Sequence, residues 1–187
     1  EHACRQTQEW RQQTPHSEDV TISVNLSSRS FSHPRIVDVV AQILEETGLP
    51  ASALKLEVTE SSIMDNESSS DVMDALKELG VQLYLDDFGT GYSSLSYLQR
   101  FNVDALKIDK SFVQRLAGGG EPGEIVGAIT SLAHNLGLKV IAEGVQTPAQ
   151  LDHLRELGCE YGQGYLFSRP LDPAYAHALI VEDPTWE

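Results

Sequence analysis

Cysteines and long hydrophobic runs are both scarce in this sequence. The two cysteines, Cys4 and Cys159, lie far apart and form no CxxC metal-binding pair, so we expect reduced thiols. No apolar run approaches the roughly 18 to 20 residues that a membrane-spanning helix needs. Residues 1–15 are polar and contain no apolar signal-peptide core. We therefore expect a cytoplasmic location, whether or not a longer parent protein is anchored in a membrane.

Basic residues are also few. Lys and Arg number 13 against 28 Asp and Glu, which gives a formal net charge of −15 at pH 7. A protein that binds duplex nucleic acid needs a basic surface, so this composition argues strongly against that function class. It does not exclude a ligand that carries phosphate, because clustered carboxylates can bind divalent cations that reverse the local field.

An initiator methionine is absent, and we expect the 187 residues to be a piece of a longer protein. Hydrophobic residues make up 41% of the chain, which is typical of a globular domain. This length is sufficient for one domain with a substantial buried core.

The stretch LDDFGTGYSSL, residues 85–95, allows three interpretations. DFG at residues 87–89 spells the magnesium-binding triplet of kinases, GTG at residues 89–91 could cradle a phosphate, and the aspartates at 86–87 could bind a metal. A kinase would also need a Gly-rich strand pair, a VAIK-type lysine and an HRD loop, and a P-loop would need Gly-Lys-Ser/Thr. None of these is present, so metal-binding carboxylates followed by a mobile loop remain.

Two further motif classes find little support. AGGGEPGE, residues 117–124, formally matches GxGxxG, but its proline and the lack of a directly preceding strand favour a flexible loop over a dinucleotide site. The six histidines are scattered, with no HExxH motif, so we expect them at the surface or in packing rather than as zinc ligands.

Short β-branched segments alternate with helical patterns along the chain. We predict strands at residues 21–26, 54–59, 81–86, 104–109, 139–144 and 159–167. We predict amphipathic helices at residues 36–47, 71–79, 124–136 and 148–157, each followed by a glycine before the next strand. This alternation with short loops indicates an α/β fold with a parallel sheet, as a barrel or as an open doubly wound sheet.

Polar side chains close almost every predicted strand. They are Asn25 at the first strand, Glu57 and Glu60 at the second, Asp86 and Asp87 at the third, Lys107 and Asp109 at the fourth, Glu143 at the fifth and Gln163 in the sixth. In a parallel sheet these ends lie on one face, where βα-barrel enzymes build their sites. Six polar strand ends are hard to explain by structure alone, so we expect a functional site there.

The side chains in this set offer mainly oxygen ligands. Carboxylates and one amide, with no His or Cys, suit Mg²⁺ or Mn²⁺ and suit zinc poorly. Adjacent aspartates such as Asp86 and Asp87 can serve two metal ions, and two metals about 3.5–4 Å apart promote in-line attack on a phosphodiester. A lysine at a neighbouring strand end, here Lys107, can hold the attacking water and offset phosphate charge.

These residues lie in six motifs that closely resemble the EAL-domain phosphodiesterases of bacterial cyclic-di-GMP signalling. The motifs are VNLSSRSF (24–31), LEVTES (56–61), LDDFGTGYSSLSYL (85–98), LKIDKSFV (106–113), VIAEGVQT (140–147) and QGYLFSRP (163–170). They occur in order, so we interpret residues 1–187 as a partial EAL domain in which residues 1–13 resemble the helix of the preceding unit. The resemblance implies a TIM-like (β/α) barrel that linearises cyclic-di-GMP to pGpG.

The resemblance also implies a set of metal ligands. Asn25, Glu57 and Asp86 resemble the ligands of one metal ion, with Asp86 as the bridge to a second. Asp87 would serve the second ion, and Glu143 would act there directly or through water. The implied cofactors are two Mg²⁺ or Mn²⁺ ions.

Other positions resemble residues of the reaction itself. Lys107 matches the lysine near the attacking water, and together with Glu143 and Asp87 it makes the expected catalytic set. Asp109 resembles a supporting acid, and Gln163 resembles a residue at the substrate and water site, so we expect both to contact substrate.

A loop after the two aspartates completes the resemblance. Glu60 resembles the residue that anchors this loop, residues 87–95, and Gly89 and Gly91 would be its hinges. In this family the loop is tied to dimerisation and metal occupancy, so we expect a homodimer.

Two departures from the family pattern stand out. Gln146 replaces a usual glutamate in AEGVQT, and we expect this to modulate rather than abolish activity. The name-giving Glu-Ala-Leu segment and the arginine that follows it are not in the sequence. We count six strand–helix units, whereas a closed barrel has eight and typically about 250 residues. We therefore expect an N-terminally truncated barrel, incomplete or domain-swapped, with impaired hydrolysis.

Two function classes follow from the sequence. The first is a metal-dependent cyclic-di-GMP phosphodiesterase, with sensory or GGDEF-type domains flanking it in the parent protein. The alternative is a non-catalytic cyclic-di-GMP receptor or protein-interaction module of the same fold. The metal-ligand positions that degenerate relatives usually lose are filled here, which favours the enzyme.

Overall fold

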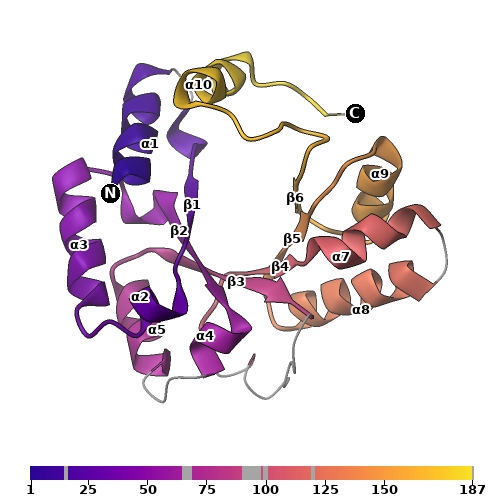
Figure 1. Ribbon diagram of the computed structural model, residues 1–187, viewed down its shortest axis with the longest axis horizontal. Coiled ribbons are helices and arrows are strands. Elements are labelled where there is room, and N and C mark those ends of the chain that lie inside the picture. The colour runs from indigo at the N-terminus through magenta and orange to yellow at the C-terminus, as the bar shows by residue number, and fades with distance from the viewer. Residues whose placement is uncertain (15–16, 65–68, 90–97, 99–100, 119–120, 187) are drawn as a thin grey trace. The chain divides into compact units, whose positions relative to one another are not determined.

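The structure, a computed structural model, describes residues 1–14, 17–64, 69–89, 98, 101–118 and 121–186 (Figure 1). Its chain divides into two compact units. The first comprises Glu1–Leu83, Arg100–Asn102 and Leu171–Thr185, and the second comprises Tyr84–Gln99, Val103–Pro170 and Trp186–Glu187. The described residues contain six strands that alternate with helices, which confirms the predicted α/β alternation.

The first unit contains one parallel strand pair. β1 (Ile22–Asn25) runs beside β2 (Leu54–Thr59), with Ile22 opposite Leu54 and Asn25 opposite Glu57. The helices of this unit are α1 (His2–Gln13), α2 (Ser28–Phe31), α3 (Ile36–Thr47), α4 (Glu60–Met64), α5 (Ser69–Glu78) and α10 (Pro173–Glu182). Short 3₁₀ turns lie at Ser17–Asp19 (η1) and Ala51–Ala53 (η2).

Helix α3 shows how closely the sequence pattern fixes an element. It buries Ile36 and Val40, which lie one turn apart, and it spans the same residues that the apolar periodicity predicts. The helix ends at Gly48, whose φ of 67° is the left-handed conformation that glycine adopts without strain.

The second unit contains four strands in chain order, and each neighbouring pair is parallel. They are β3 (Gln82–Phe88), which belongs to this unit from Tyr84 on, β4 (Ala105–Ile108), β5 (Lys139–Glu143) and β6 (Tyr161–Gln163). The helices are α7 (Lys110–Val113), the 3₁₀ turn η3 (Gln114–Gly118), α8 (Glu121–Asn135) and α9 (Pro148–Glu156).

The core of the second unit forms around strand β4. All four of its residues are buried, and helix α8 packs against β4 and β5 (Figure 1). Val126 and Ala133 of α8 and Leu106 of β4 have no exposed surface. A strand that is buried on both faces needs a continuous apolar sequence, so the single lysine within β4, Lys107, is an exception that calls for a reason.

The loop between β5 and α9 is held by one buried glutamine. Thr147 and Gln150 form a capping box at the start of α9. The Gln150 side chain accepts hydrogen bonds from the backbone N–H groups of Gln146 (2.8 Å) and Thr147 (3.0 Å), and it donates to the carbonyl of Val113 (3.2 Å). The backbone beyond Glu143 is therefore fixed by a side chain that is itself 4% exposed.

Three sequence predictions need correction. Residues 121–124 are not loop, because α8 begins at Glu121, and Pro122 is tolerated in the first helical turn, where no intrahelical N–H bond is required. The third strand extends to Phe88, and the sixth is limited to Tyr161–Gln163. Helix α10 was not predicted, because its apolar residues do not gather on one face and none is buried. None of the described helices combines the length and apolarity needed to cross a bilayer.

Candidate functional site

The two adjacent aspartates lie in an irregular stretch at the end of β3. Leu85 pairs with Leu106 and Phe88 with Ile108, so Asp86 and Asp87 together oppose one residue of β4. This is a β-bulge, and within it Asp87 has a φ of 55°, which is uncommon for a residue other than glycine. Neighbouring side chains of a regular strand point to opposite faces, whereas this bulge brings the two carboxylates together.

Lys107 is the residue that the two aspartates oppose, and it is 3% exposed. Its Nζ lies 2.6 Å from Glu143 Oε1 and 3.1 Å from Asp86 Oδ1. A buried ammonium needs such partners, because removing it from water without them carries a large free-energy cost. The lysine within β4 is therefore explained by carboxylates on the strands at either side.

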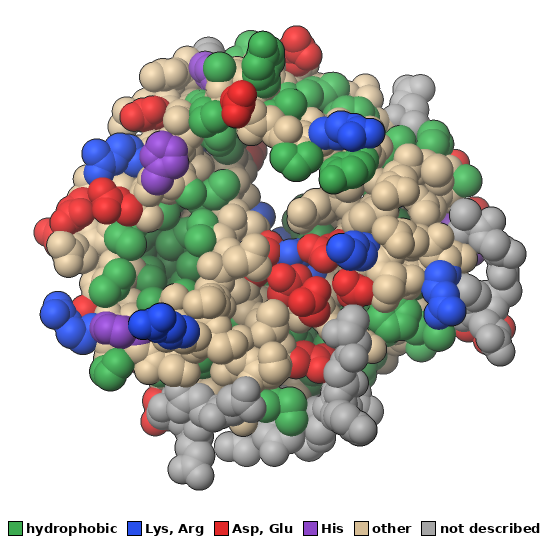
Figure 2. Space-filling view, in the orientation of Figure 1, with side chains coloured by type: hydrophobic (Ala, Val, Ile, Leu, Met, Phe, Trp, Pro, Cys, Tyr) green, Lys and Arg blue, Asp and Glu red, His purple; other side chains and the backbone are tan. Residues whose placement is uncertain are grey.

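Three carboxylates converge next to this lysine. Oxygen atoms of Asp86, Asp87 and Glu143 all lie within 4.8 Å of one another. One ammonium against three carboxylates leaves two negative charges in excess. Figure 2 shows Asp and Glu side chains gathered beside Lys or Arg side chains in one region of the face it presents. An all-oxygen group with surplus negative charge fits a hard divalent cation such as Mg²⁺ or Mn²⁺.

The pKa of Asp87 is raised in these surroundings. Burial raises its pKa above the ordinary value, the negative charges of Asp86 and Asp109 raise it further, and the positive charges of Lys107 and Lys110 act in the opposite direction. Burial and like charge both disfavour the ionised form of Asp87, and a bound cation would favour it.

Asn25 and Glu57 lie together in the first unit. They are register partners at the ends of β1 and β2, and the Leu26 N–H donates to the Glu57 carbonyl at 2.8 Å. Glu57 is 6% exposed, whereas Asn25 is exposed. Glu60 is the first residue of α4, three positions further along. Within this unit, two of the expected metal ligands are neighbours.

Asp109 sits where β4 passes into α7. It caps the helix, because its Oδ1 accepts a hydrogen bond from the backbone N–H of Ser111 at 2.9 Å. Burial acts to raise its pKa, but hydrogen bonds from Ser111 and Lys110 outweigh burial and lower it. Asp109 therefore has a structural role as a helix cap in addition to any role toward a substrate.

Gln163 and the loop glycines complete the expected site. Gln163 ends β6 opposite Glu143, which places it at the same edge of the second unit. Gly89 has a φ of 92°, and a Cβ there would lie 3.0 Å from the Phe112 ring, so glycine is required. Gly91 lies outside the described residues.

One residue of this edge was missed from the sequence. Lys110 directly follows Asp109, and its charge acts on both Asp87 and Asp109. The signal was available, since Lys110 stands one position beyond two polar residues that mark the end of the fourth strand. A search restricted to strand residues passes over side chains at the start of the following helix.

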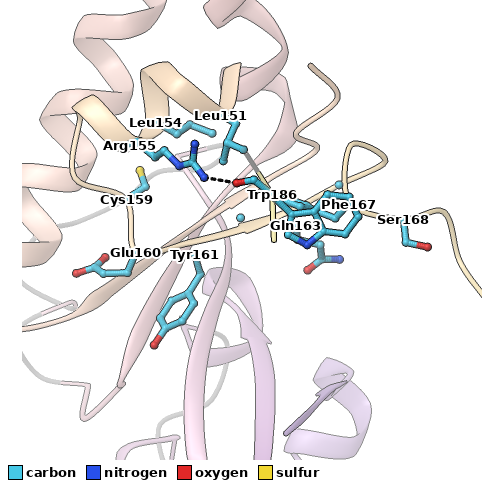
Figure 3. Close-up of a pocket in the computed structure, with 12 residues that line it drawn as sticks. Leu151, Leu154, Arg155, Cys159, Glu160, Tyr161, Gln163, Phe167, Ser168 and Trp186 are labelled. Atoms are coloured by element: carbon cyan, nitrogen blue, oxygen red, sulfur yellow. Dashed lines mark hydrogen bonds between the residues drawn. The ribbon is translucent and has the colours of Figure 1, made fainter. Parts of the chain in front are cut away.

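A cavity lies elsewhere in the second unit, apart from the three carboxylates. It has a volume of about 590 Å³ and is lined by α9, β6 and the segment around Trp186 (Figure 3). Arg155 donates a hydrogen bond to the Trp186 carbonyl, and Phe167 packs edge-on against the indole ring at 5.5 Å between ring centroids. Gln163 is on its wall, but none of the three clustered carboxylates is, so this cavity is separate from the carboxylate group.

The chain belongs to the EAL-domain family. The model of the EAL domain matches residues 1–170, which confirms the resemblance seen in the motifs. The cyclic di-GMP phosphodiesterase NbdA of Pseudomonas aeruginosa is 49% identical over 155 residues, which cover 82% of this chain and 20% of NbdA. The bifunctional diguanylate cyclase/cyclic di-GMP phosphodiesterase MucR of the same organism is 45% identical over 170 residues, 90% of this chain and 24% of MucR.

Solved structures of EAL proteins share the fold. The PaMucR phosphodiesterase in complex with c-di-GMP matches with a TM-score of 0.88 and 43% identity over 94% of this chain and 70% of its own. BlrP1 of Klebsiella pneumoniae, solved with manganese and cyclic di-GMP, matches with a TM-score of 0.79 and 32% identity over 90% of this chain and 42% of its own. The predicted fold class, an α/β fold of the TIM-like barrel type, is confirmed.

Proposed function

We propose that this domain hydrolyses cyclic-di-GMP to linear pGpG by a two-metal mechanism. The observation that carries the proposal is the group formed by Lys107 with Asp86, Asp87 and Glu143, in which one buried cation faces a surplus of carboxylates. The proteins that it resembles support the substrate, since NbdA and MucR are cyclic di-GMP phosphodiesterases and the PaMucR structure contains c-di-GMP.

The metal ligands in this proposal are Asp86, Asp87 and Glu143, together with Asn25 and Glu57 as the family resemblance implies. The manganese and calcium complexes of BlrP1 support a divalent ion. When bound, Mg²⁺ or Mn²⁺ would lower the pKa of water and neutralise charge on the phosphodiester. The carboxylates would hold the ions, and the bulge at Asp87 allows two adjacent aspartates to face one centre.

Lys107 acts on the attacking water and the phosphate. Its ammonium has only donors, so it can hold a water through the water's oxygen and stabilise negative charge on a phosphate oxygen. The carboxylates of Glu143 and Asp86 fix its position at 2.6 and 3.1 Å, which keeps this donor aimed before substrate arrives. Asp109 and Gln163 orient substrate and water at the same edge.

The proposal includes the wider setting of the domain. The chain spans 20% of NbdA and 24% of MucR, so further domains of sensory or GGDEF type are expected beside it. We propose that it works in the cytoplasm as a homodimer, with the loop of residues 87–95, anchored by Glu60, linking metal occupancy to dimerisation. Both described cysteines are free thiols, which fits a reducing compartment.

The deciding experiment is a turnover and binding assay with cyclic-di-GMP in the presence of Mn²⁺. This chain and a version extended at its N-terminus along the parent gene are compared by chromatography of pGpG and by calorimetry. We expect turnover by the extended protein and weaker turnover by the chain alone, with both binding cyclic-di-GMP.

One control variant sharpens this assay. Asp87→Asn should remove turnover while the protein stays folded, because asparagine tolerates the left-handed backbone at this position. Binding without turnover in both chain lengths would instead favour the receptor, and an absence of binding in both would contradict either function.

A further inference from the structure

The segment of residues 144–147, which directly follows Glu143, is joined on one side to the chain around β6. The Val145 N–H donates to the Gln163 carbonyl at 3.0 Å, and the Val145 carbonyl accepts from the Leu166 N–H at 3.0 Å. Both bonds run from backbone to backbone, so they do not depend on the side chains that the segment carries. On this side the segment is therefore held as an extension of the pairing between β5 and β6.

The other side of the segment lies against helix α7. A Cβ on Gly144 would lie 2.6 Å from the Cβ of Lys110, and Gly144 has a φ of 72°, so a side chain at this position would be both obstructed and strained. Helix α7 follows β4, the strand that carries Lys107. The contact therefore joins the segments that follow two neighbouring strands, and across these strands Lys107 Nζ lies 2.6 Å from Glu143 Oε1.

The side chain of Gln150 links the segment to α7. Its Oε1 accepts from the N–H groups of Gln146 and Thr147, and its Nε2 donates to the Val113 carbonyl at 3.2 Å. Val113 is the last residue of α7 and has no exposed surface. One buried amide thus uses its acceptor on the segment after β5 and its donor on the helix after β4.

The presence of an amide at this position is informative. Glutamate forms a capping box as readily as glutamine does, and its negative charge is favourable near the N-terminus of a helix. A carboxylate at residue 150 would therefore serve the start of α9 at least as well. It could not donate to the Val113 carbonyl, however, and two acceptors would then face each other in buried surroundings. The contact with α7 therefore requires the amide, whereas the cap of α9 does not.

We propose that Gln150 is a positioning residue that holds Glu143 beside Lys107 and thereby sets the metal affinity of the carboxylate group. The inference rests on the function proposed above and assigns a role in it to a residue outside the site. Gln150 acts through the backbone of residues 146–147 and through α7. Without this link the segments after β4 and β5 can move apart, and a misplacement of about 1 Å by a distant mutation can slow a reaction by roughly 10²-fold.

The test uses the N-terminally extended protein and measures the Kd for Mn²⁺ by calorimetry, together with kcat and KM for cyclic-di-GMP. Gln150→Glu keeps the acceptor that caps α9 and removes the donor to Val113. We expect this variant to raise the Kd for Mn²⁺ and to lower kcat by about tenfold each, with KM unchanged, as for residues that orient a metal ligand. Gln150→Met removes both contacts, so its effect should be at least as large.

Thr130→Val is the matched control, because it also removes one buried side-chain hydrogen bond. The Thr130 side chain is buried and donates to the Val126 carbonyl at 2.8 Å, within helix α8. This variant should be less stable in urea unfolding, while its Kd for Mn²⁺ and its kcat stay unchanged. A purely structural role of Gln150 would give the same pattern as this control.

The outcomes separate the inference from the proposed function. A Gln150→Glu variant that keeps the Mn²⁺ affinity and kcat of the unaltered protein overturns the inference and leaves the proposed function standing. A raised KM with an unchanged Kd for Mn²⁺ also overturns it, since Gln150 would then act on the substrate. Gln150→Glu decides the question even where Gln150→Met does not fold, because the cap of α9 is kept. Failure of the unaltered protein to bind Mn²⁺ overturns both.

Discussion

Charged side chains lie at both ends of the strands in the second unit, and their surroundings differ. At the carboxyl ends, Lys107 is 3% exposed and faces three carboxylates, one of which, Asp87, has a raised pKa because of burial and like charge. At the amino ends, Glu160 is 40% exposed, and the His134 ring nitrogen and the Val140 N–H lie 3.1 and 2.9 Å from its oxygens.

The pKa of Glu160 reflects these contacts. Burial acts to raise it, but the hydrogen bond from Val140 and the contact with His134 outweigh burial and lower it. At the amino ends, the charge of Glu160 is therefore balanced by hydrogen bonds and by His134, as in a structural ion pair. The carboxyl ends gather three carboxylates around one buried ammonium, and such clusters with a perturbed pKa are typical of functional sites.

Removing the buried lysine should give the largest effect. Lys107→Met leaves Asp86 and Glu143 without their cation, and breaking one partner of a buried ion pair typically costs about 3–5 kcal/mol of unfolding free energy. Turnover should fall by roughly 10²–10⁴-fold. Urea unfolding without metal measures the first, and pGpG formation measures the second.

Lys139→Met tests the amino ends with the same substitution. Lys139 is exposed, and its Nζ lies 3.3 Å from the Tyr161 hydroxyl, so its loss should cost about 0.5 kcal/mol or less. Added Mn²⁺ should restore part of the stability of Lys107→Met, because a divalent cation replaces the lost charge. Equal destabilisation by the two variants would mean that the charge of Lys107 contributes no more to the unfolding free energy than the charge of an exposed lysine.

The stabilisation of the folded chain by metal should depend on the carboxylates at the carboxyl ends and not on those at the amino ends. Mn²⁺ at about 100 times its Kd is expected to raise the unfolding free energy by about 2.7 kcal/mol. Asp87→Asn should lose most of this gain, since one of the three converging carboxylates is removed. Glu160→Gln should keep it, and a loss in both variants would place the metal elsewhere. Thermal unfolding with and without Mn²⁺ measures the difference.

The two ends should also respond to pH in opposite directions when metal is absent. The pKa of Asp87 is raised from 3.8, so folding is most favoured below that value and loses stability as pH rises through the raised pKa. The pKa of Glu160 is lowered from 4.5, so its contribution is present above pH 4.5 and is lost as pH falls through the lowered pKa.

Two variants separate these contributions. Asp87→Asn should become more stable than the unaltered chain as pH rises above about 4, whereas Glu160→Gln should be less stable near neutral pH and match it in acid. Urea unfolding in EDTA from pH 3 to 7 measures both. Parallel profiles would refute the contrast between the two strand ends.

Much of the fold and of the candidate site could be predicted from the sequence, because burial and polarity produce local residue patterns. Apolar periodicity located α3 to the residue, and the polar residues that close strands identified Asp86, Lys107 and Glu143. What it could not supply was backbone irregularity. The bulge that turns Asp86 and Asp87 toward one centre cannot be located from residue types, because its register shift depends on how β3 pairs with β4.

Helix α10 was missed for a related reason. An amphipathic helix is recognisable in a sequence by one buried apolar face, and no residue of Pro173–Glu182 is buried. Lys110 was missed because it follows the strand end, so a reading of strand residues alone leaves it out although the motif LKIDKSFV contains it. Its position depends on the close approach of Gly144, which brings two segments far apart in sequence into contact.

The smallest effect is expected from the histidine at the amino ends. His134→Ala removes one partner of Glu160, but the pair is 40% exposed on both sides, and such surface pairs contribute about 0–1 kcal/mol. The Val140 N–H still donates to Glu160, and alanine suits helix α8, so a loss of about 0.5 kcal/mol or less is expected.

Urea unfolding at pH 7 measures this loss, and Glu160→Gln is the comparison, because an amide oxygen can still accept from Val140. A loss of several kcal/mol from His134→Ala would mean that the amino ends also depend on a buried charge network. The distinction between structural and functional charge in this unit would then have to be drawn from metal dependence rather than from burial.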